Sequence, residues 1–348
     1  MKIKIAIADT NETYAKRLFE ALSRQNNLSL SVFTDKDKLE KEIAYARYDI
    51  ILFDYSMYSN DSLFKSAKLA VALYDEDSEV PYNIPGKYKA VKKYQRGTTI
   101  YKEVIGLYSE YVSESPFFNH SKHNFKVICF YSPVGGSGKT TVSMACAHSI
   151  ANKGRNVMYL NFEPAASYGV YLPLKGGKGI GELFAAIGGS GSFSLKLESL
   201  MKKTPQGIIY FEKFENLLDI YEITSEDIEK LIRMIGDTEK AEYVVIDMGS
   251  DFNDLNRGIM DISDKIVLVE RPEKTAKEKI SAFCSHEPVK REYADKICSV
   301  INFSPDNSCQ SAGGFETAGR IPERKSDCEE LVSYISRYSL INIDTLLS

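Results

Sequence analysis

A glycine-rich segment around residue 136 constrains this chain more than any other feature of its sequence. It reads Gly-Gly-Ser-Gly-Lys-Thr over residues 135–140, after an apolar run at 125–131 and before a predicted helix at 140–153. Glycines at such a junction let successive backbone N–H groups curl around a phosphate, and the helix start adds the positive end of its dipole. The alternative is a glycine-rich turn that precedes Lys-Thr by chance, and the flanking strand and helix argue against it. We therefore interpret the segment as a phosphate-binding loop.

The two residues after the last glycine of this loop have separate expected tasks. Lys139 can reach the β and γ phosphates of a nucleotide, and the hydroxyl of Thr140 can bind Mg²⁺. The general pattern GxxxxGK[ST] begins with glycine, whereas this chain has Pro133 there. The predicted nucleotide contacts in the loop are Gly135, Gly136, Ser137, Gly138, Lys139, Thr140 and Thr141.

Both halves of the chain alternate predicted strands and helices. In the first half, strands are expected at 3–8, 28–33, 48–54, 69–73 and 91–94. Helices are expected there at 11–25, 35–46 and 98–111. In the second half, strands are expected at 125–131, 156–160, 243–247, 266–269 and 297–302. Strands that alternate with helices predict an α/β fold with parallel sheets covered on both faces.

The length of 348 residues predicts two domains. Hydrophobic residues make up 43% of the chain and charged residues 26%, which is typical of a globular protein. We expect a first domain at 1–111, a polar linker containing a proline at 112–124, and a P-loop domain at 125–348.

Charge and hydropathy bear on location and partners. No apolar run approaches the roughly 18 residues of a membrane span, and no signal peptide follows Met1, so we expect a cytoplasmic protein. Residues 1–124 carry 18 basic and 17 acidic side chains, and the remainder carries 26 and 31. Neither part has the basic excess of a dedicated nucleic-acid-binding protein. The tail at 330–341 has apolar spacing and a single arginine, which favours a packing helix over a membrane-binding one.

The phosphate loop resembles the deviant Walker A motif of the MinD/ParA ATPases, Lys-Gly-Gly-x-Gly-Lys-[Ser/Thr]. Five of its positions match, and Val134 stands in the place of the first, signature lysine. In that family the signature lysine reaches the phosphates of a partner subunit across a nucleotide-sandwich dimer. The resemblance implies ATP and Mg²⁺ as ligands and a homodimer as the assembly, while the valine leaves dimer-activated hydrolysis open.

Two further strands resemble catalytic strands of the same family. The strand at 243–247 resembles the Walker B strand, which implies that Asp247 binds Mg²⁺ through water; a helix N-cap is the alternative. Asn161-Phe162-Glu163 stands in the place of an Asp-x-Asp whose members contact Mg²⁺ and orient the attacking water. An asparagine cannot act as a base, so a water-positioning role falls to Glu163, unless that residue is a solvated loop residue. The implied catalytic residues are Lys139, Glu163 and Asp247.

Two short motifs near the C-terminus resemble the family's base pocket. The strand that ends at Asn302 resembles one whose asparagine contacts the adenine edge, although an asparagine at a strand end is also a common turn residue. Gly-Arg-Ile-Pro at 319–322 resembles the Gly-x-Ile-Pro that follows, which implies that Pro322 lines the base pocket.

Residues 1–111 resemble the receiver domain of response regulators, a flavodoxin-like fold. The buried strand before Asp54 matches the phosphoacceptor strand, and Asp9 matches one of the two acids that hold Mg²⁺. Thr10 replaces the second acid, and no hydroxyl ends the fourth strand. Lys92 or Lys93 matches the lysine after the fifth strand. Because phosphoryl transfer needs Mg²⁺ to neutralise oxygen charge, these losses favour a pseudo-receiver that docks or dimerises.

A receiver-like domain ahead of a MinD/ParA-type domain is the arrangement of the CpaE/TadZ family of tight-adherence pilus assembly. This resemblance implies a nucleotide-binding dimer that localises the pilus secretion machinery, at a cell pole or at the inner face of the membrane. Two alternatives stay open. One is a MinD/ParA-like positioning ATPase for another cargo, and the other is a scaffold that binds ATP without hydrolysing it.

Overall fold

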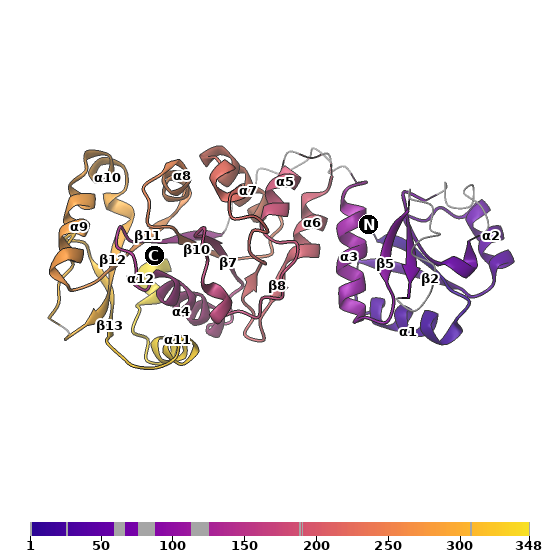
Figure 1. Cartoon of the computed structure of the whole chain (residues 1–348), viewed down its shortest axis with the longest axis horizontal. Helices are drawn as coiled ribbons and strands as arrows, with labels where there is room; N and C mark the ends of the chain where they lie inside the picture. The colour runs from indigo at the N-terminus through magenta and orange to yellow at the C-terminus, as the bar shows by residue number, and fades with distance from the viewer. Residues whose placement is uncertain are drawn as a thin grey trace. The chain divides into compact units, whose positions relative to one another are not determined.

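The computed structural model divides the chain into two compact units. It describes residues 2–25, 27–58, 67–75, 88–112, 125–187, 189, 191–306 and 308–347. One unit comprises Met1–Pro116 with Gly188–Leu200, and the other comprises Phe117–Ile187 with Met201–Ser348 (Figure 1). The linker predicted at 112–124 lies almost wholly outside the described residues.

The first unit is built on a five-stranded parallel sheet in the order β2-β1-β3-β4-β5. Its strands are β1 (Ile3–Ala8), β2 (Leu28–Phe33), β3 (Ile50–Asp54), β4 (Leu69–Tyr74) and β5 (Lys89–Lys92). Its first three helices are α1 (Glu12–Leu22), α2 (Lys36–Tyr45) and α3 (Gly97–Ser109). The predicted flavodoxin-like order of elements is confirmed, but the fifth strand begins and ends two residues earlier than predicted.

Alternation along the strands gives this sheet two apolar faces. Ile5 and Ile7 pack with α1 and α3, whereas Ala6 and Ala8 pack with α2. Asn11 caps α1 as predicted, since its side chain accepts a hydrogen bond from the Tyr14 amide at 3.1 Å. This packing fixes the carboxyl ends of β1 and β3 at one edge of the sheet.

A helix from the second half of the sequence belongs to the first unit. This helix, α6 (Phe193–Leu200), packs along α3. The Tyr101 hydroxyl donates to Glu198 Oε1 at 2.7 Å, and the Ser192 amide donates to the Ser109 carbonyl at 2.8 Å. A Cβ atom on Gly191 would lie 2.5 Å from that carbonyl, so the close approach requires glycine.

The second unit contains an eight-stranded sheet in the order β13-β12-β11-β6-β10-β7-β9-β8. All neighbours are parallel except β8 and β9. Its strands are β6 (Lys126–Tyr131), β7 (Val157–Phe162), β8 (Lys202–Lys203), β9 (Ile209–Tyr210), β10 (Tyr243–Met248), β11 (Lys265–Glu270), β12 (Ile297–Ser304) and β13 (Thr317–Pro322). The last strand is not predicted from the sequence, because glycine, arginine and proline interrupt its apolar pattern.

Helices cover both faces of this sheet. The helices of the second unit are α4 (Lys139–Asn152), α5 (Gly181–Ile187), α7 (Ser225–Asp237), α8 (Asp254–Ile262), α9 (Lys274–Ser285), α10 (Glu287–Glu292), α11 (Cys328–Arg337) and α12 (Ile343–Leu347). Figure 1 shows α4 and α11 on the opposite side of the strands from α7, α8 and α10. The tail helix α11 buries Val332 and Ile335 in the core beside α4, as a packing helix should.

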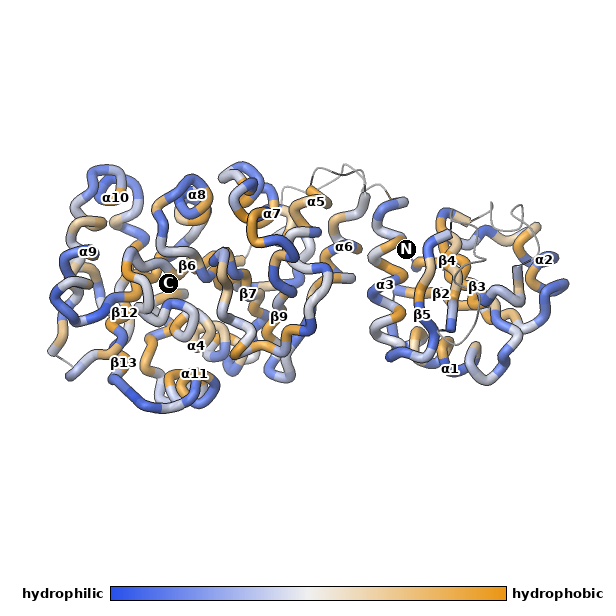
Figure 2. The backbone as a smooth tube through the Cα atoms, in the orientation of Figure 1, coloured by the Kyte–Doolittle hydropathy of each residue, from blue (hydrophilic) through white to orange (hydrophobic). Residues whose placement is uncertain are grey.

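The distribution of hydropathy follows these layers. In Figure 2 hydrophobic residues gather along the strands, and hydrophilic residues mark the outer turns of the helices. In the described part of the chain, no helix combines the length and apolarity needed to cross a membrane.

Candidate functional site

The predicted phosphate loop leaves the middle of the larger sheet. Strand β6 lies between β10 and β11, and the chain turns from its carboxyl end directly into α4. Gly136 and Gly138 have φ angles of 68° and 85°, which favour glycine. A Cβ atom on Gly138 would also lie 2.3 Å from the side-chain nitrogen of Asn302. Both conformation and close packing therefore require glycine at position 138.

Lys139 is buried and connects the loop to the segment after β10. Its ammonium group donates a hydrogen bond to the Ser250 hydroxyl at 2.8 Å, and the residue is 5% exposed. Ser250 lies two residues after the end of β10. The structure thus brings together the lysine of the phosphate loop and the segment that follows Asp247.

Asp247 is fully buried beside the loop, and only one of its two carboxylate oxygens accepts hydrogen bonds from described residues. Oδ2 accepts hydrogen bonds from the Asn161 amide at 2.7 Å and the Tyr159 hydroxyl at 3.1 Å. Oδ1 has no hydrogen-bond partner among the described residues. Burial raises the pKa of Asp247 to about 6, although Thr140 and Lys139 act to lower it. Because a buried oxygen without a donor can serve as a ligand to a divalent cation, this carboxylate and the Thr140 hydroxyl fit Mg²⁺.

Asn161 occupies the position directly opposite Asp247 on the neighbouring strand β7. Its Nδ2 group donates to Asp247, and its Oδ1 accepts from the Glu163 amide at 3.1 Å. An aspartate there would place a second carboxylate 2.7 Å from the first, and like charges at that distance resist joint ionisation. Glu163 lies near enough to contribute to the rise in the pKa of Asp247. The three residues thus meet at one edge of the sheet, and the asparagine acts as a neutral donor.

Asn302 contacts the phosphate loop. It is 4% exposed, its Nδ2 group donates to the Ser137 carbonyl at 2.9 Å, and its Oδ1 accepts from the Phe303 amide at 3.0 Å. This arrangement gives Asn302 a role in holding the loop that the sequence does not reveal. Pro322 is exposed at the end of β13, opposite Ser304 of β12, so both predicted base-pocket residues lie on adjacent strands.

Arg271, which follows β11, also contacts the loop and is not predicted from the sequence. One of its terminal nitrogens, Nη1, donates to the Gly136 carbonyl at 3.1 Å. Its guanidinium lies 4.6 Å from the centroid of the Phe303 ring and forms an ion pair with Glu273. The sequence gives one indication of this contact. Arg271 directly follows an apolar strand, and the carboxyl ends of parallel strands meet at one edge of a sheet.

The receiver-like site of the first unit is held together by a lysine. Lys93 is buried, lies 2.6 Å from Asp9 Oδ2 and also pairs with Asp54 Oδ2, so it is the lysine that matches the receiver pattern. Burial alone would raise the pKa of Asp54, but hydrogen bonds from Lys93 and Ser56 lower it overall. The pKa of Asp9 is raised by burial despite the same lysine.

Comparisons with known proteins match each of the two units separately. One family model, the TadZ-like receiver domain, matches residues 1–109, and another, an AAA domain, matches residues 125–297. The chain resembles the ParA family ATPase from Chlorobium tepidum TLS, with a TM-score of 0.51 and 16% identity over 64% of this chain and 92% of that one. It also resembles a chain of the MinC:MinD cell division protein complex from Aquifex aeolicus, with a TM-score of 0.50 and 16% identity over 64% and 94% of the two chains. No curated protein matches the sequence significantly.

The second unit is therefore a P-loop domain with the fold of the ParA and MinD ATPases, preceded by a receiver domain. The chain thus combines a TadZ-like receiver domain at residues 1–109 with an AAA domain at residues 125–297. This combination supports a nucleotide-binding factor in positioning or assembly.

Proposed function

We propose that this protein binds ATP with Mg²⁺, forms a homodimer, and acts as a localisation and assembly factor for a pilus secretion system. The observation that carries the proposal is the buried Asp247 oxygen without a donor, beside a glycine-rich loop and Thr140. The TadZ-like receiver domain supports the pilus role. We place the protein in the cytoplasm, at a cell pole or at the inner face of the membrane.

The residues of the loop would share the binding of the triphosphate. Backbone N–H groups of residues 135–140 surround the phosphates, and Lys139 adds a charge for the β and γ groups. Thr140 and Asp247 would hold Mg²⁺, which neutralises phosphate charge when bound. Asn302 holds the loop through Ser137, and we propose that it lines a base pocket together with Pro322.

Hydrolysis is proposed to be slow or absent. The position that carries a cation in the MinD/ParA family holds Val134, which is 9% exposed and buried in the fold. Asn161 donates its amide to Asp247 and cannot accept a proton from water. Glu163 is then left to orient a water molecule. These substitutions favour one further candidate, a scaffold that binds ATP and never turns it over.

Turnover and oligomeric state test the proposal in the same samples. Wild type and Glu163→Gln would be incubated with Mg²⁺-ATP, and phosphate release would be recorded beside the mass from light scattering. We expect an ATP-dependent dimer, with turnover that is slow in the wild type and lost in the variant. A stable dimer without turnover in either protein would support the scaffold. A monomer that binds no ATP would contradict the proposed function.

A further inference from the structure

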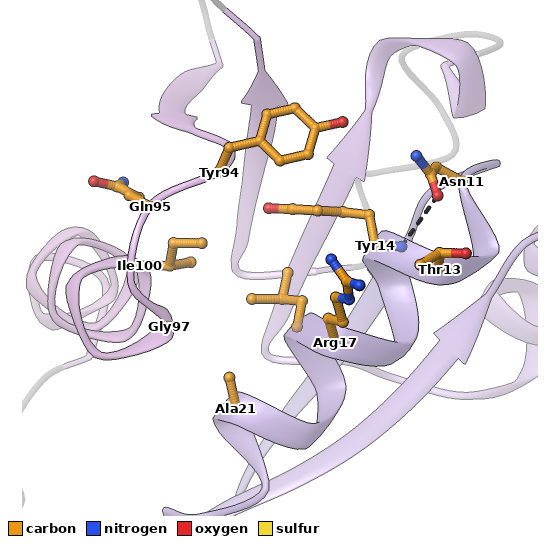
Figure 3. A pocket seen from close by; sticks show the side chains of 10 residues that line it. Asn11, Thr13, Tyr14, Arg17, Ala21, Tyr94, Gln95, Gly97 and Ile100 are labelled. Atoms are coloured by element: carbon orange, nitrogen blue, oxygen red, sulfur yellow. Dashed lines mark hydrogen bonds between the residues drawn. The ribbon is translucent and has the colours of Figure 1, made fainter.

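The first unit contains a cavity that the nucleotide site does not explain. It has a volume of about 370 Å³ and lies between α1 and the segment that leads from β5 into α3. Figure 3 shows side chains from both elements facing it. At one end the helices approach closely, because a Cβ atom on Gly97 would lie 2.4 Å from the Cβ atom of Ala21. The volume falls within the range of ligand pockets, roughly 300–1,000 Å³.

A buried hydroxyl without a partner points into this cavity. Tyr14 is 8% exposed, and its hydroxyl has no hydrogen-bond partner among the described residues. In Figure 3 the hydroxyl end of Tyr14 extends from α1 toward the side on which Tyr94 and Ile100 lie. Burial raises the pKa of Tyr14, so the phenol keeps its proton and can donate. Buried polar groups nearly always have partners, so this hydroxyl is available to donate to a ligand atom.

The opposite wall offers an aromatic surface. Tyr94 is 62% exposed, and its ring lies 5.3 Å from the Tyr14 ring in an edge-to-face arrangement. Its backbone has a φ of 54°, in the left-handed region that residues other than glycine rarely adopt. Strained backbone of this kind concentrates at functional sites. An exposed ring held in this way suits contact with a planar group.

The lining has one charged side chain. Arg17 lies one helical turn after Tyr14, and its guanidinium points toward the Tyr14 ring in Figure 3. It forms no ion pair within the part of the chain that the structure describes. The nearby Lys93 is already paired with Asp9 and Asp54, although its ammonium lies 5.0 Å from the centroid of the Tyr14 ring. Arg17 is therefore the cation available to an anionic ligand.

We propose that this cavity, the tyrosine pocket, binds a small anion that carries a planar aromatic ring. The ring contacts Tyr94, the anionic group pairs with Arg17, and a polar atom accepts a hydrogen bond from Tyr14. Nucleoside monophosphates and aromatic carboxylates share this chemistry. An occupant would touch the same tyrosine ring that contacts Lys93, so the tyrosine pocket adjoins the carboxylates of the receiver domain.

Ligand-observed NMR and calorimetry on the full chain test this proposal. Adenosine monophosphate and guanosine monophosphate are the probes for nucleoside monophosphates, and phenylacetate is the probe for aromatic carboxylates. Adenosine and ribose 5-phosphate present the ring and the anion separately. We expect at least one complete probe to bind with a Kd at or below about 1 mM, and each half-probe to bind about 10-fold more weakly or not at all.

Matched variants show where the probe binds. Tyr14→Phe keeps the ring and removes the hydroxyl, and we expect it to weaken binding about 5- to 100-fold. Arg17→Gln should weaken it about 10- to 100-fold, while Arg24→Gln, which changes an exposed arginine outside the lining, should leave it within about 2-fold. Lys139→Ala should leave probe binding unchanged and abolish ATP binding.

Several outcomes would overturn the proposal. One is that none of the probes binds, and another is that adenosine binds as tightly as its monophosphate, which would remove the anionic requirement. Binding that survives Tyr14→Phe and Arg17→Gln but disappears in Lys139→Ala would place the probe in the phosphate loop instead.

Discussion

Two aspartates in this protein occupy equivalent places in their sheets and have opposite surroundings. Asp54 ends β3 in the first unit, and Asp247 lies at the end of β10 in the second. Asp54 pairs directly with Lys93, which it shares with Asp9. Asp247 has a lysine nearby too, but Lys139 donates to Ser250 and leaves one carboxylate oxygen without a partner. A carboxylate at the end of a parallel strand is therefore open to a cation only when no side chain has already neutralised it.

The pKa values express the same difference. The pKa of Asp54 is lowered overall, so its ionised form stabilises the fold at neutral pH and that contribution is lost as the pH falls. The pKa of Asp247 is raised to about 6, so its ionised form costs stability above that pH. The first unit thus contains a carboxylate that a lysine neutralises. The second contains a buried carboxylate whose ionised form is destabilised until a cation binds it.

Removing Lys93 should have the largest effect, because it takes away the cation that neutralises the carboxylates of the first unit. Lys93→Ala leaves the buried Asp9 and the half-buried Asp54 without a cation, and we expect the first unit to lose about 3 kcal/mol of stability. Amide hydrogen exchange in β1 and β3 would report the loss for that unit alone. Adding Asp9→Asn should restore part of it. Protection unchanged from wild type would show that the lysine does not hold the site.

Neutralising Asp247 should instead increase the free energy of unfolding. Asp247→Asn removes a charge that burial disfavours, and we expect the free protein to gain about 1–3 kcal/mol at pH 8. The folded pKa lies above the unfolded one, so the native carboxylate takes up a proton as the pH falls through about 6. The gain should therefore shrink below pH 6 and vanish below about pH 4. Urea unfolding at several pH values checks this, and a variant less stable than wild type at pH 8 would contradict it.

Removing a contact that holds the phosphate loop should have a smaller energetic effect than the two changes above. That effect should appear in the affinity for ATP. Asn302→Ala removes the hydrogen bond to the Ser137 carbonyl, worth about 1 kcal/mol, so we expect an approximately 5- to 10-fold loss. Equilibrium dialysis with labelled ATP measures it. Asn342, an exposed residue in the C-terminal turn before α12, provides the control. An equal loss in Asn342→Ala would remove the specific role of Asn302.

The smallest expected effect belongs to Arg271. Its guanidinium is partly exposed, so Arg271→Ala should weaken ATP binding about 3-fold at low salt and less at high salt. Arg291→Ala, which changes an exposed side chain of α10, is the matched control. A salt-independent loss would mean that the residue acts by shaping the loop through Gly136 and not by its charge.

Local sequence patterns predicted the helices and strands better than they predicted the contacts between them. The bounds of β1 and β2 agree with the predicted strands, because alternation and apolar runs mark them. The short strands β8 and β9 have too few residues to form a pattern. Helix α6 gives no local sign that it packs against α3, since that choice depends on surfaces formed by distant segments.

The candidate site shows the same division. The phosphate loop and Asp247 can be recognised from contiguous residues, because glycine conformation and strand-end position are local properties. Three contacts join segments that are far apart in the sequence: Asp247 with Asn161, Ser137 with Asn302, and Gly136 with Arg271. Only the register of the sheet places them together.

Binding of Mg²⁺-ATP to paired aspartate variants tests the central claim most directly. Calorimetric titrations would compare wild type, Asp247→Asn and Asp54→Asn, each with Mg²⁺ and with a chelator. We expect Mg²⁺ to strengthen ATP binding in wild type and in Asp54→Asn, and to have no effect in Asp247→Asn. A Mg²⁺ effect that persists in Asp247→Asn, or is lost in Asp54→Asn, would contradict the assignment of the open carboxylate to the second unit.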